Sequence, residues 1–407
     1  MEKELYSKAC VASSIKFAVS EATENDANLT ESDRISRNLA TILARDKEVV
    51  AVYLKILPEK CKAYISKNDV WREEDDEYIS KIQNCLKNMS ENPVKKLEEA
   101  WKREDVRTLF TEAMTYCSAK LDSRFKKLKQ DIIKDKHDSH IKSFIEQAKI
   151  DVENINEVNK QKLSRCCCEY YKKIKNDITI PEKFKRHIRK VGSYVGSLID
   201  ITKCAINAKN KILFSNMELY KLNPIIINQP IFSWKRIIQE FIPDPDDYKV
   251  YEEICLDKDL IKKRLDFIYD GRSDIEDIEQ RIYLHAELNI LTNIINQEDK
   301  SRVFIAVSKR CCYLCELYIE FAKLKGYNIV TPGSHKKIYH KWKLPDVTNV
   351  DFRNESMSHI LASLNQIIEN EIAQYTSELA RSDSDGHSIN SDDNDFQNID
   401  DMFDDIF

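Results

Sequence analysis

The first half of the chain is dominated by hydrophobic residues at helical spacing. Between residues 106 and 117 the apolar positions recur three or four residues apart, so they line one face of a helix and are expected to pack in a core. Residues 1–191 contain no glycine and residues 1–180 contain only two prolines, so few strong breakers interrupt the helical pattern. We therefore predict an α-helical region of unknown role over residues 1–214.

Short apolar runs that predict strands alternate with helical stripes in the second half of the chain. Seven of the nine prolines follow residue 180, and we place the change of domain near residues 205–222. The sequence RVFIAVSK, residues 302–309, has the β-branched and apolar composition of a buried strand. A helical stripe follows, and NIVTPG then predicts another strand. This alternation predicts an α/β domain over residues 215–380.

The last residues of the chain are strongly acidic, although the formal charge of the whole chain is only −5. Residues 381–407 hold nine Asp and one Arg, a charge of −8, so residues 1–380 carry +3. A segment this charged buries too little apolar surface to order itself, and we predict a disordered acidic tail there. Its few apolar residues are spaced like one face of a short helix, so the tail either folds onto a protein partner or serves only solubility.

No segment has the length and apolar character of a membrane span, and the N-terminal residues lack the apolar stretch of a secretion signal. We expect an intracellular protein, cytoplasmic or nuclear, with no membrane partner. The 12 cysteines are then expected to stay reduced, which leaves clustered ones available for metal binding or chemistry. Cys166, Cys167 and Cys168 are an exception, because consecutive helical residues point about 100° apart and do not readily converge on one ion.

Two short motifs in the α/β region carry candidate chemistry. His285 and Glu287 stand two residues apart, and Cys312 and Cys315 form a Cys-x-x-Cys pair. Residues two apart within a helix point about 200° apart, so His285 and Glu287 can face one site only if they straddle the start of a helix. A Cys-x-x-Cys pair at a helix start places both sulfurs near unpaired N–H groups, which favour the thiolate form that binds metal.

Two thiolates and one imidazole supply three protein ligands for Zn²⁺ and leave its fourth position for water, which is typical of a catalytic site. Bound water has a pKa near neutrality, and a carboxylate that is not a ligand can carry its proton to a leaving group. We predict that His285, Cys312 and Cys315 bind zinc and that Glu287 is the catalytic proton shuttle. Zinc deaminases use the same arrangement, H-x-E followed by P-C-x-x-C, to attack a nucleobase with zinc-bound water.

These motifs resemble the cytidine-deaminase-like superfamily. The sequences LHAEL, VSKRCCYLCE and GSHKKIYHKWKLP together resemble its divergent branch from rickettsiae and fungi, over about residues 215–370. The resemblance implies a cytidine-deaminase-like fold with a mixed sheet between helices, zinc on His285, Cys312 and Cys315, and Glu287 as proton shuttle. It also implies that the substrate is a nucleic acid or a nucleotide.

The segment from Gly333 to Pro345 mixes basic and aromatic residues, which is the mixture that stacks bases and meets phosphates. The candidate substrate-binding residues are His335, Lys336, Lys337, Tyr339 and Trp342. The alternative is a hydrated loop whose aromatic residues are anchored in the core. Two other basic runs, residues 124–130 and 183–190, could also touch nucleic acid, although such runs on helices usually form the hydrated face.

We expect a zinc-dependent deaminase of a nucleobase, in single-stranded nucleic acid or nucleotide form, in which Glu287 moves the proton. One alternative is a catalytically inactive deaminase fold that serves as a binding or effector module. Another is a helical interaction protein with a structural zinc. Cys311 bears on this last possibility, because it stands where the superfamily has a proline and its thiol could close a four-ligand site.

Overall fold

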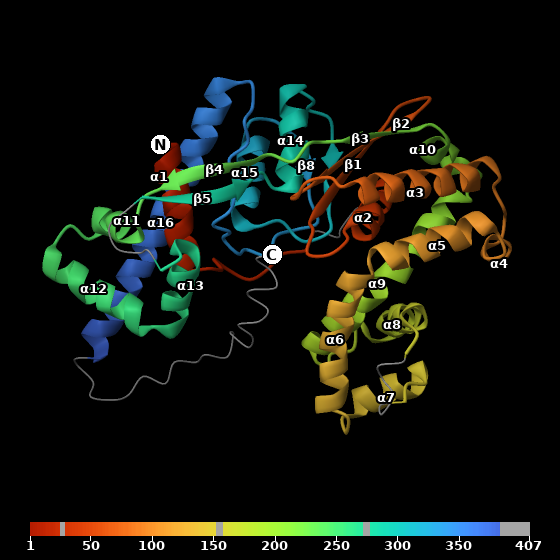
Figure 1. Ribbon diagram of the computed structural model, residues 1–407, viewed down its shortest axis with the longest axis horizontal. Coiled ribbons are helices and arrows are strands. Elements are labelled where there is room, and N and C mark those ends of the chain that lie inside the picture. The colour runs from red at the N-terminus through yellow and green to blue at the C-terminus, as the bar shows by residue number, and fades with distance from the viewer. Residues whose placement is uncertain (25–28, 152–157, 272–276, 383–407) are drawn as a thin grey trace. The chain divides into compact units, whose positions relative to one another are not determined.

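The computed structural model (Figure 1) describes residues 1–24, 29–151, 158–271 and 277–382, with side chains described up to residue 375. The chain divides into two compact units. We call them the site unit, which comprises residues 1–27, 222–305 and 309–407, and the helical unit, which comprises residues 28–221 and 306–308. Most of the predicted acidic tail, residues 383–407, lies outside the described residues.

Helices make up most of the helical unit. They are α2 (Glu31–Leu43), α3 (Glu73–Glu91), α4 (Leu97–Ala100), α5 (Glu104–Tyr116), α6 (Ser118–Lys134), α7 (Ser139–Ala148), α8 (Lys160–Ile174), α9 (Glu182–Ala205) and α10 (Lys211–Ser215). The predicted apolar stripe of residues 106–117 lies on α5 and its C-cap residue Cys117, and all of its members except the half-buried Met114 are buried, which confirms its place in a core. A further apolar cluster contains residues of α6, α7, α8 and α9. Within it the ring of Phe144 packs against the rings of Tyr170 and Phe184.

A mixed four-stranded sheet also lies in the helical unit, in the order β3-β2-β1-β7. Strand β1 (Val50–Ile56) is antiparallel to β2 (Cys61–Lys67) and to β7 (Ala306–Val307), while β2 is parallel to β3 (Met217–Lys221). The prediction of helix throughout residues 1–214 is therefore wrong at β1 and β2. Strand β1 is rich in β-branched residues, and it pairs with β2 along its whole length, which the scarcity of helix breakers does not reveal.

The site unit is built around its first helix, α1 (Glu2–Ile15), most of whose residues are buried. The later elements are β4 (Ile226–Ile231), α11 (Trp234–Phe241), α12 (Pro245–Asp257), α13 (Asp259–Tyr269), β5 (Ile278–Tyr283), α14 (Ala286–Asn296), β6 (Val303–Phe304), α15 (Tyr313–Leu324), β8 (Ile329–Val330) and α16 (Val350–Ser382). Helix α1 contacts α11, α13 and α16, and Figure 1 shows it alongside α16. The structure thus groups the first 27 residues with the unit that holds the candidate site, whereas the sequence placed them in the N-terminal helical region.

The strand predicted at residues 302–309 is divided into β6 and β7 by Ile305. Strand β6 pairs in parallel with β8, with Val303 opposite Ile329, and helix α15 lies between them in the chain. This order of strand, helix and strand confirms the alternation that the sequence predicts. Strands β4 and β5 form a separate antiparallel pair. None of the described helices is long and apolar enough to cross a bilayer.

Candidate metal centre

His285 and Glu287 straddle the start of α14, as their spacing requires. His285 is the N-cap residue, with an extended backbone at φ −64° and ψ 147°, and Glu287 lies in the first helical turn. Strand β5 ends two residues earlier, at Tyr283, so the chain enters the helix in an extended conformation. The apolar face that follows is buried and fixes the helix; its members are Leu288, Leu291, Ile294 and Ile295.

The Cys-x-x-Cys pair opens α15. Cys312 is the N-cap residue, and its sulfur accepts a hydrogen bond of 3.4 Å from the backbone N–H of Cys315 in the first turn. Unpaired N–H groups and the positive end of the helix dipole favour negative charge at this position. The helix start therefore stabilises a thiolate on Cys312.

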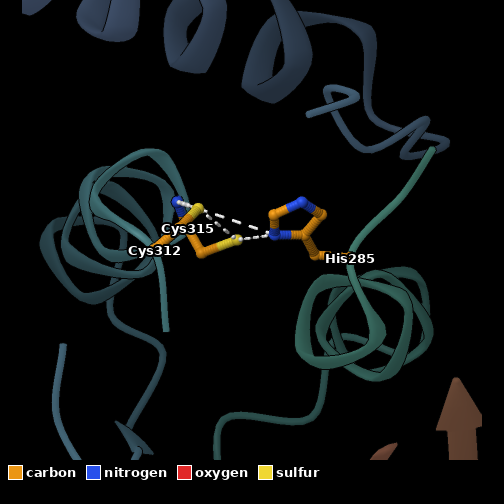
Figure 2. Close-up of side chains that lie close together, drawn as sticks. All are labelled: His285, Cys312 and Cys315. Atoms are coloured by element: carbon orange, nitrogen blue, oxygen red, sulfur yellow. Dashed lines mark hydrogen bonds between the residues drawn. The ribbon is translucent and has the colours of Figure 1, made fainter. Parts of the chain in front are cut away.

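Three side chains from these two helix starts converge on one point (Figure 2). The sulfur atoms of Cys312 and Cys315 lie 3.3 Å apart, and Nδ1 of His285 lies 3.5 Å from the first and 3.2 Å from the second. Ligands arranged tetrahedrally around one Zn²⁺ would lie about 3.5–3.8 Å apart, given bond lengths of about 2.0–2.3 Å. The observed separations are within about half an ångström of that arrangement, so this buried group could hold a metal ion.

The pKa values of the two thiols move in opposite directions. Burial alone would raise the pKa of Cys312, but the hydrogen bond from Cys315 and the positive charge of His285 outweigh burial and lower it to about 5. Burial and the neighbouring Cys312 raise the pKa of Cys315. Burial opposes the charged form of His285, but the charge of Cys312 outweighs it and raises the pKa of this imidazole. These shifts favour the thiolate form of Cys312 next to His285.

Glu287 is a buried carboxylate beside this group. Its side chain is 2% exposed, and its Oε2 atom has no hydrogen-bond partner within the described part of the chain. Its negative charge acts to raise the pKa of His285 and of Cys315 and opposes the lowering of the pKa of Cys312, which places it within electrostatic reach of all three. The Nε2 atom of His285 is likewise buried without a partner among the described residues. Buried polar atoms are usually paired, so a bound ion, a substrate or water is a candidate partner for these two atoms.

Cys311 lies next to the group but is not part of it. Its backbone N–H donates to the carbonyl of Gly333 at 3.1 Å, and its carbonyl accepts from the N–H of His335 at 3.0 Å. Burial and the charge of Glu287 raise the pKa of its thiol, which favours the neutral form. Among the described residues, the atoms that could share one ion come from the histidine and the two later cysteines.

The five predicted substrate-binding residues lie in the loop after β8 and differ in exposure. Trp342 is fully buried, so no base can stack on its ring in this conformation, whereas the other four are half-buried. The ammonium group of Lys336 lies 2.8 Å from a carboxylate oxygen of Glu316, so this lysine is already paired. The ammonium group of Lys337 lies 5.2 Å from the ring centroid of Phe17.

Aromatic rings surround His285. The ring of Tyr283 stacks on it with centroids 5.3 Å apart, and the ring of Tyr339 lies 6.1 Å away. His335 in turn packs edge-on against Tyr339 at 5.2 Å. Tyr283 is not among the site residues predicted from the sequence, although residues two apart in an extended chain share a face and its spacing from His285 is a usable signal.

A segment near the N-terminus, residues 13–24, binds the loop that carries His335 and Tyr339; we call it the N-terminal strap. Gly333 in this loop has φ +119°, and a Cβ atom there would lie 2.2 Å from the carbonyl oxygen of Thr23, so only glycine fits. No sequence motif indicated this contact. The hydrogen bonds that join the two segments run from Ser13 Oγ to Ile338 O (3.0 Å), Ile338 N to Phe17 O (2.7 Å), Val19 N to Lys336 O (3.0 Å) and Thr23 N to Ser334 O (2.8 Å).

Comparison with known protein families agrees with this geometry. Residues 284–346, which include the histidine, both cysteines and Glu287, match the model of a deaminase family, so the chain carries a deaminase-family domain. That family is described as OTT_1508-like deaminase, which confirms the predicted likeness to a divergent deaminase-like family over these residues. No curated protein and no solved structure matches the chain.

Proposed function

We propose that this protein is a zinc-dependent deaminase that acts on a nucleobase in nucleic acid or nucleotide form. The observation that carries the proposal is the convergence of His285, Cys312 and Cys315 beside the buried carboxylate of Glu287, whose Oε2 atom has no hydrogen-bond partner among the described residues. The match of residues 284–346 to a deaminase family supports the same chemistry, because this segment contains every residue of the group.

Each residue has a role that its surroundings suit. His285, Cys312 and Cys315 would hold the ion, and two sulfurs with one imidazole are a ligand set that suits Zn²⁺. A zinc ion bound there would supply a Lewis acid and a nucleophile active at neutral pH. Glu287 would hold a proton on its carboxylate and return it to the leaving amino group. The low pKa of Cys312 favours the thiolate that a metal requires.

The substrate would be held by the loop after β8 and by the aromatic residues near His285. Deaminases of this kind suggest a nucleotide or nucleic acid substrate, and the half-buried rings of Tyr283 and Tyr339 provide apolar surface for a planar base. His335 and Lys337 would orient the polar edge or phosphate of the substrate. Lys336 is bound to Glu316, so we assign it to holding the loop in place before any contact with substrate.

Two alternative functions can be distinguished from the proposed one by experiment. A deaminase fold without turnover would bind zinc and nucleic acid but release no ammonia. A structural zinc would use Cys311 as the fourth ligand, so that Cys311→Ser would lose metal as Cys312→Ser does. The pairing of the Cys311 backbone with residues 333–335 favours the three-ligand site, because it gives this residue a structural role of its own.

Replacing one carboxylate tests the proposed reaction. We expect Glu287→Gln to keep its zinc and its fold but to lose turnover by at least about 100-fold, because the amide cannot shuttle a proton. Glu320→Gln is the matched control: it changes an exposed carboxylate on α15 and should leave activity unchanged. The measurement is conversion of cytosine or adenine in a short single strand and in free nucleotides. Equal activity of Glu287→Gln and wild type would rule out this mechanism.

A further inference from the structure

The sheet of the helical unit carries three tyrosines in one row. Tyr53 on β1 is paired directly with Tyr64 on β2, and Tyr64 is paired directly with Tyr220 on β3, so all three lie on the same face. The ring centroids are 5.8 Å apart for the first pair and 5.2 Å apart for the second, with interplanar angles of 15° and 20°. We call this continuous stack the tyrosine row.

The tyrosine row becomes more exposed toward the edge of the sheet. Tyr53 is 7% exposed, Tyr64 is half-buried and Tyr220 is 38% exposed. Tyr220 lies on β3, the first strand in the sheet order, so the stack ends there. Stacked rings attract one another beyond the effect of buried area, and an open end lets a further planar group extend the stack.

The neighbouring row on the same face is basic. Lys55, Lys62 and Glu218 are paired with one another across the three strands, two residues from the tyrosines. The ammonium group of Lys62 lies 5.4 Å from the ring centroid of Tyr220. Lys60 neutralises Glu218 with a contact of 2.8 Å, so this carboxylate does not cancel the positive charge of Lys62. Phosphates would be attracted to this row.

We propose that the tyrosine row and the lysines beside it bind single-stranded nucleic acid, with a base stacked on Tyr220 and phosphates near Lys55 and Lys62. Every base offers a π-face, so binding of this kind tolerates many sequences. A duplex offers no such face, because its bases are already stacked and paired. An acidic peptide would meet the lysines but has no bases with which to extend the stack.

This inference deepens the substrate class of the proposed deaminase, but it concerns a surface of the helical unit that contains no residue of the metal group. Binding at this surface requires neither metal nor turnover. A failure of the deaminase chemistry and a failure of this surface are therefore distinguishable. Unchanged activity in Glu287→Gln would count against the chemistry alone, whereas unchanged strand binding in the tyrosine variant would count against the surface alone.

The test is the affinity of the full-length protein for a fluorescent single strand of about 15 nucleotides, a length typical of one such surface. We expect the double change Tyr64→Leu and Tyr220→Leu to weaken binding about tenfold or more, because each lost stacking contact is worth about 1–3 kcal/mol. Tyr220→Phe keeps the ring and should bind within about twofold of wild type. The pair Lys55→Gln and Lys62→Gln should weaken binding and reduce the slope of log affinity against log salt by about 1.4, at about 0.7 per contact.

A matched control removes two exposed lysines from the basic helical runs, Lys126→Gln and Lys183→Gln, and should leave affinity unchanged. Circular dichroism and melting temperature check that each variant is folded; if the leucine variant unfolds, the glutamine pair and Tyr220→Phe decide the question. The proposal is overturned if a folded leucine variant binds like wild type, if a duplex of the same sequence binds as tightly, or if only the control pair weakens binding.

Discussion

The two units each bury a cluster of ionisable side chains, and the clusters differ in how completely their atoms are paired. In the helical unit, the Lys67 ammonium lies 2.6 Å from Asp75 and 3.1 Å from Glu48, and the Tyr116 hydroxyl donates to Asp75 at 2.8 Å. Burial would raise the pKa of Asp75, but its bonds to Lys67, Arg72 and Tyr116 outweigh burial and lower it. In the site unit, Glu287 Oε2 and His285 Nε2 have no partner among the described residues.

The first cluster is satisfied by its own members, whereas the second has two buried polar atoms that a ligand could satisfy. A buried charge is tolerated when neighbouring groups satisfy it, as they do around Lys67. Buried polar atoms left unsatisfied in a native protein need another explanation, such as catalysis or an ion. The comparison predicts that breaking the first cluster damages stability alone, whereas breaking the second damages metal binding and chemistry.

The largest expected loss of stability follows from Lys67→Met. This change leaves Asp75 and Glu48 buried without their counter-charge, which should lower the free energy of unfolding by about 3–5 kcal/mol. Urea unfolding followed by circular dichroism measures the loss, and the folded variant should still bind its full complement of zinc. A reduced zinc content in Lys67→Met with an unchanged free energy of unfolding would mean that the two clusters do not have separate roles.

A smaller loss should follow from Gly333→Ala, which tests the N-terminal strap. The new Cβ meets the backbone of Thr23 and the residue must keep a positive φ, so we expect a cost of about 2–5 kcal/mol. The matched control is Gly271→Ala, where φ is also positive but no atom of the described residues lies within 4 Å of the new Cβ. If the two variants melt at the same temperature, the close contact with the strap contributes nothing.

The smallest effect is expected from deleting residues 383–407. A segment of this charge buries little surface on folding, so the free energy of unfolding should change by less than about 0.5 kcal/mol. We propose that the tail binds a protein partner through its apolar residues, and this role would leave stability of the free protein unchanged. A drop of several degrees in melting temperature would instead show that the tail docks on the rest of the chain.

The sequence indicated that His285, Cys312 and Cys315 would lie together because the geometry that brings them together is local. A helix start fixes the directions of residues two or three apart, so His285 with Glu287 and Cys312 with Cys315 each carried their own geometric signal. The alternation of β6, α15 and β8 was visible for the same reason. Contacts between residues distant in sequence left no such signal. The strap binds residues more than 300 positions away in the chain. Strands β1 and β2 are stabilised by pairing with each other, which the hydrophobic spacing along either segment does not indicate.

The central claim is that His285, Cys312 and Cys315 form a three-ligand metal centre, and zinc content per chain tests it most directly. Purified wild type and Cys311→Ser should each carry one zinc per chain, whereas Cys312→Ser and Cys315→Ser should lose it. Removing a ligand should cost more affinity than the roughly 10–100-fold that follows loss of an outer-shell partner. Cys255→Ser, which alters a buried thiol elsewhere in the site unit, controls for any general effect of losing a cysteine. Full zinc in Cys312→Ser and Cys315→Ser would contradict the site, and loss of zinc in Cys311→Ser would contradict its three-ligand form.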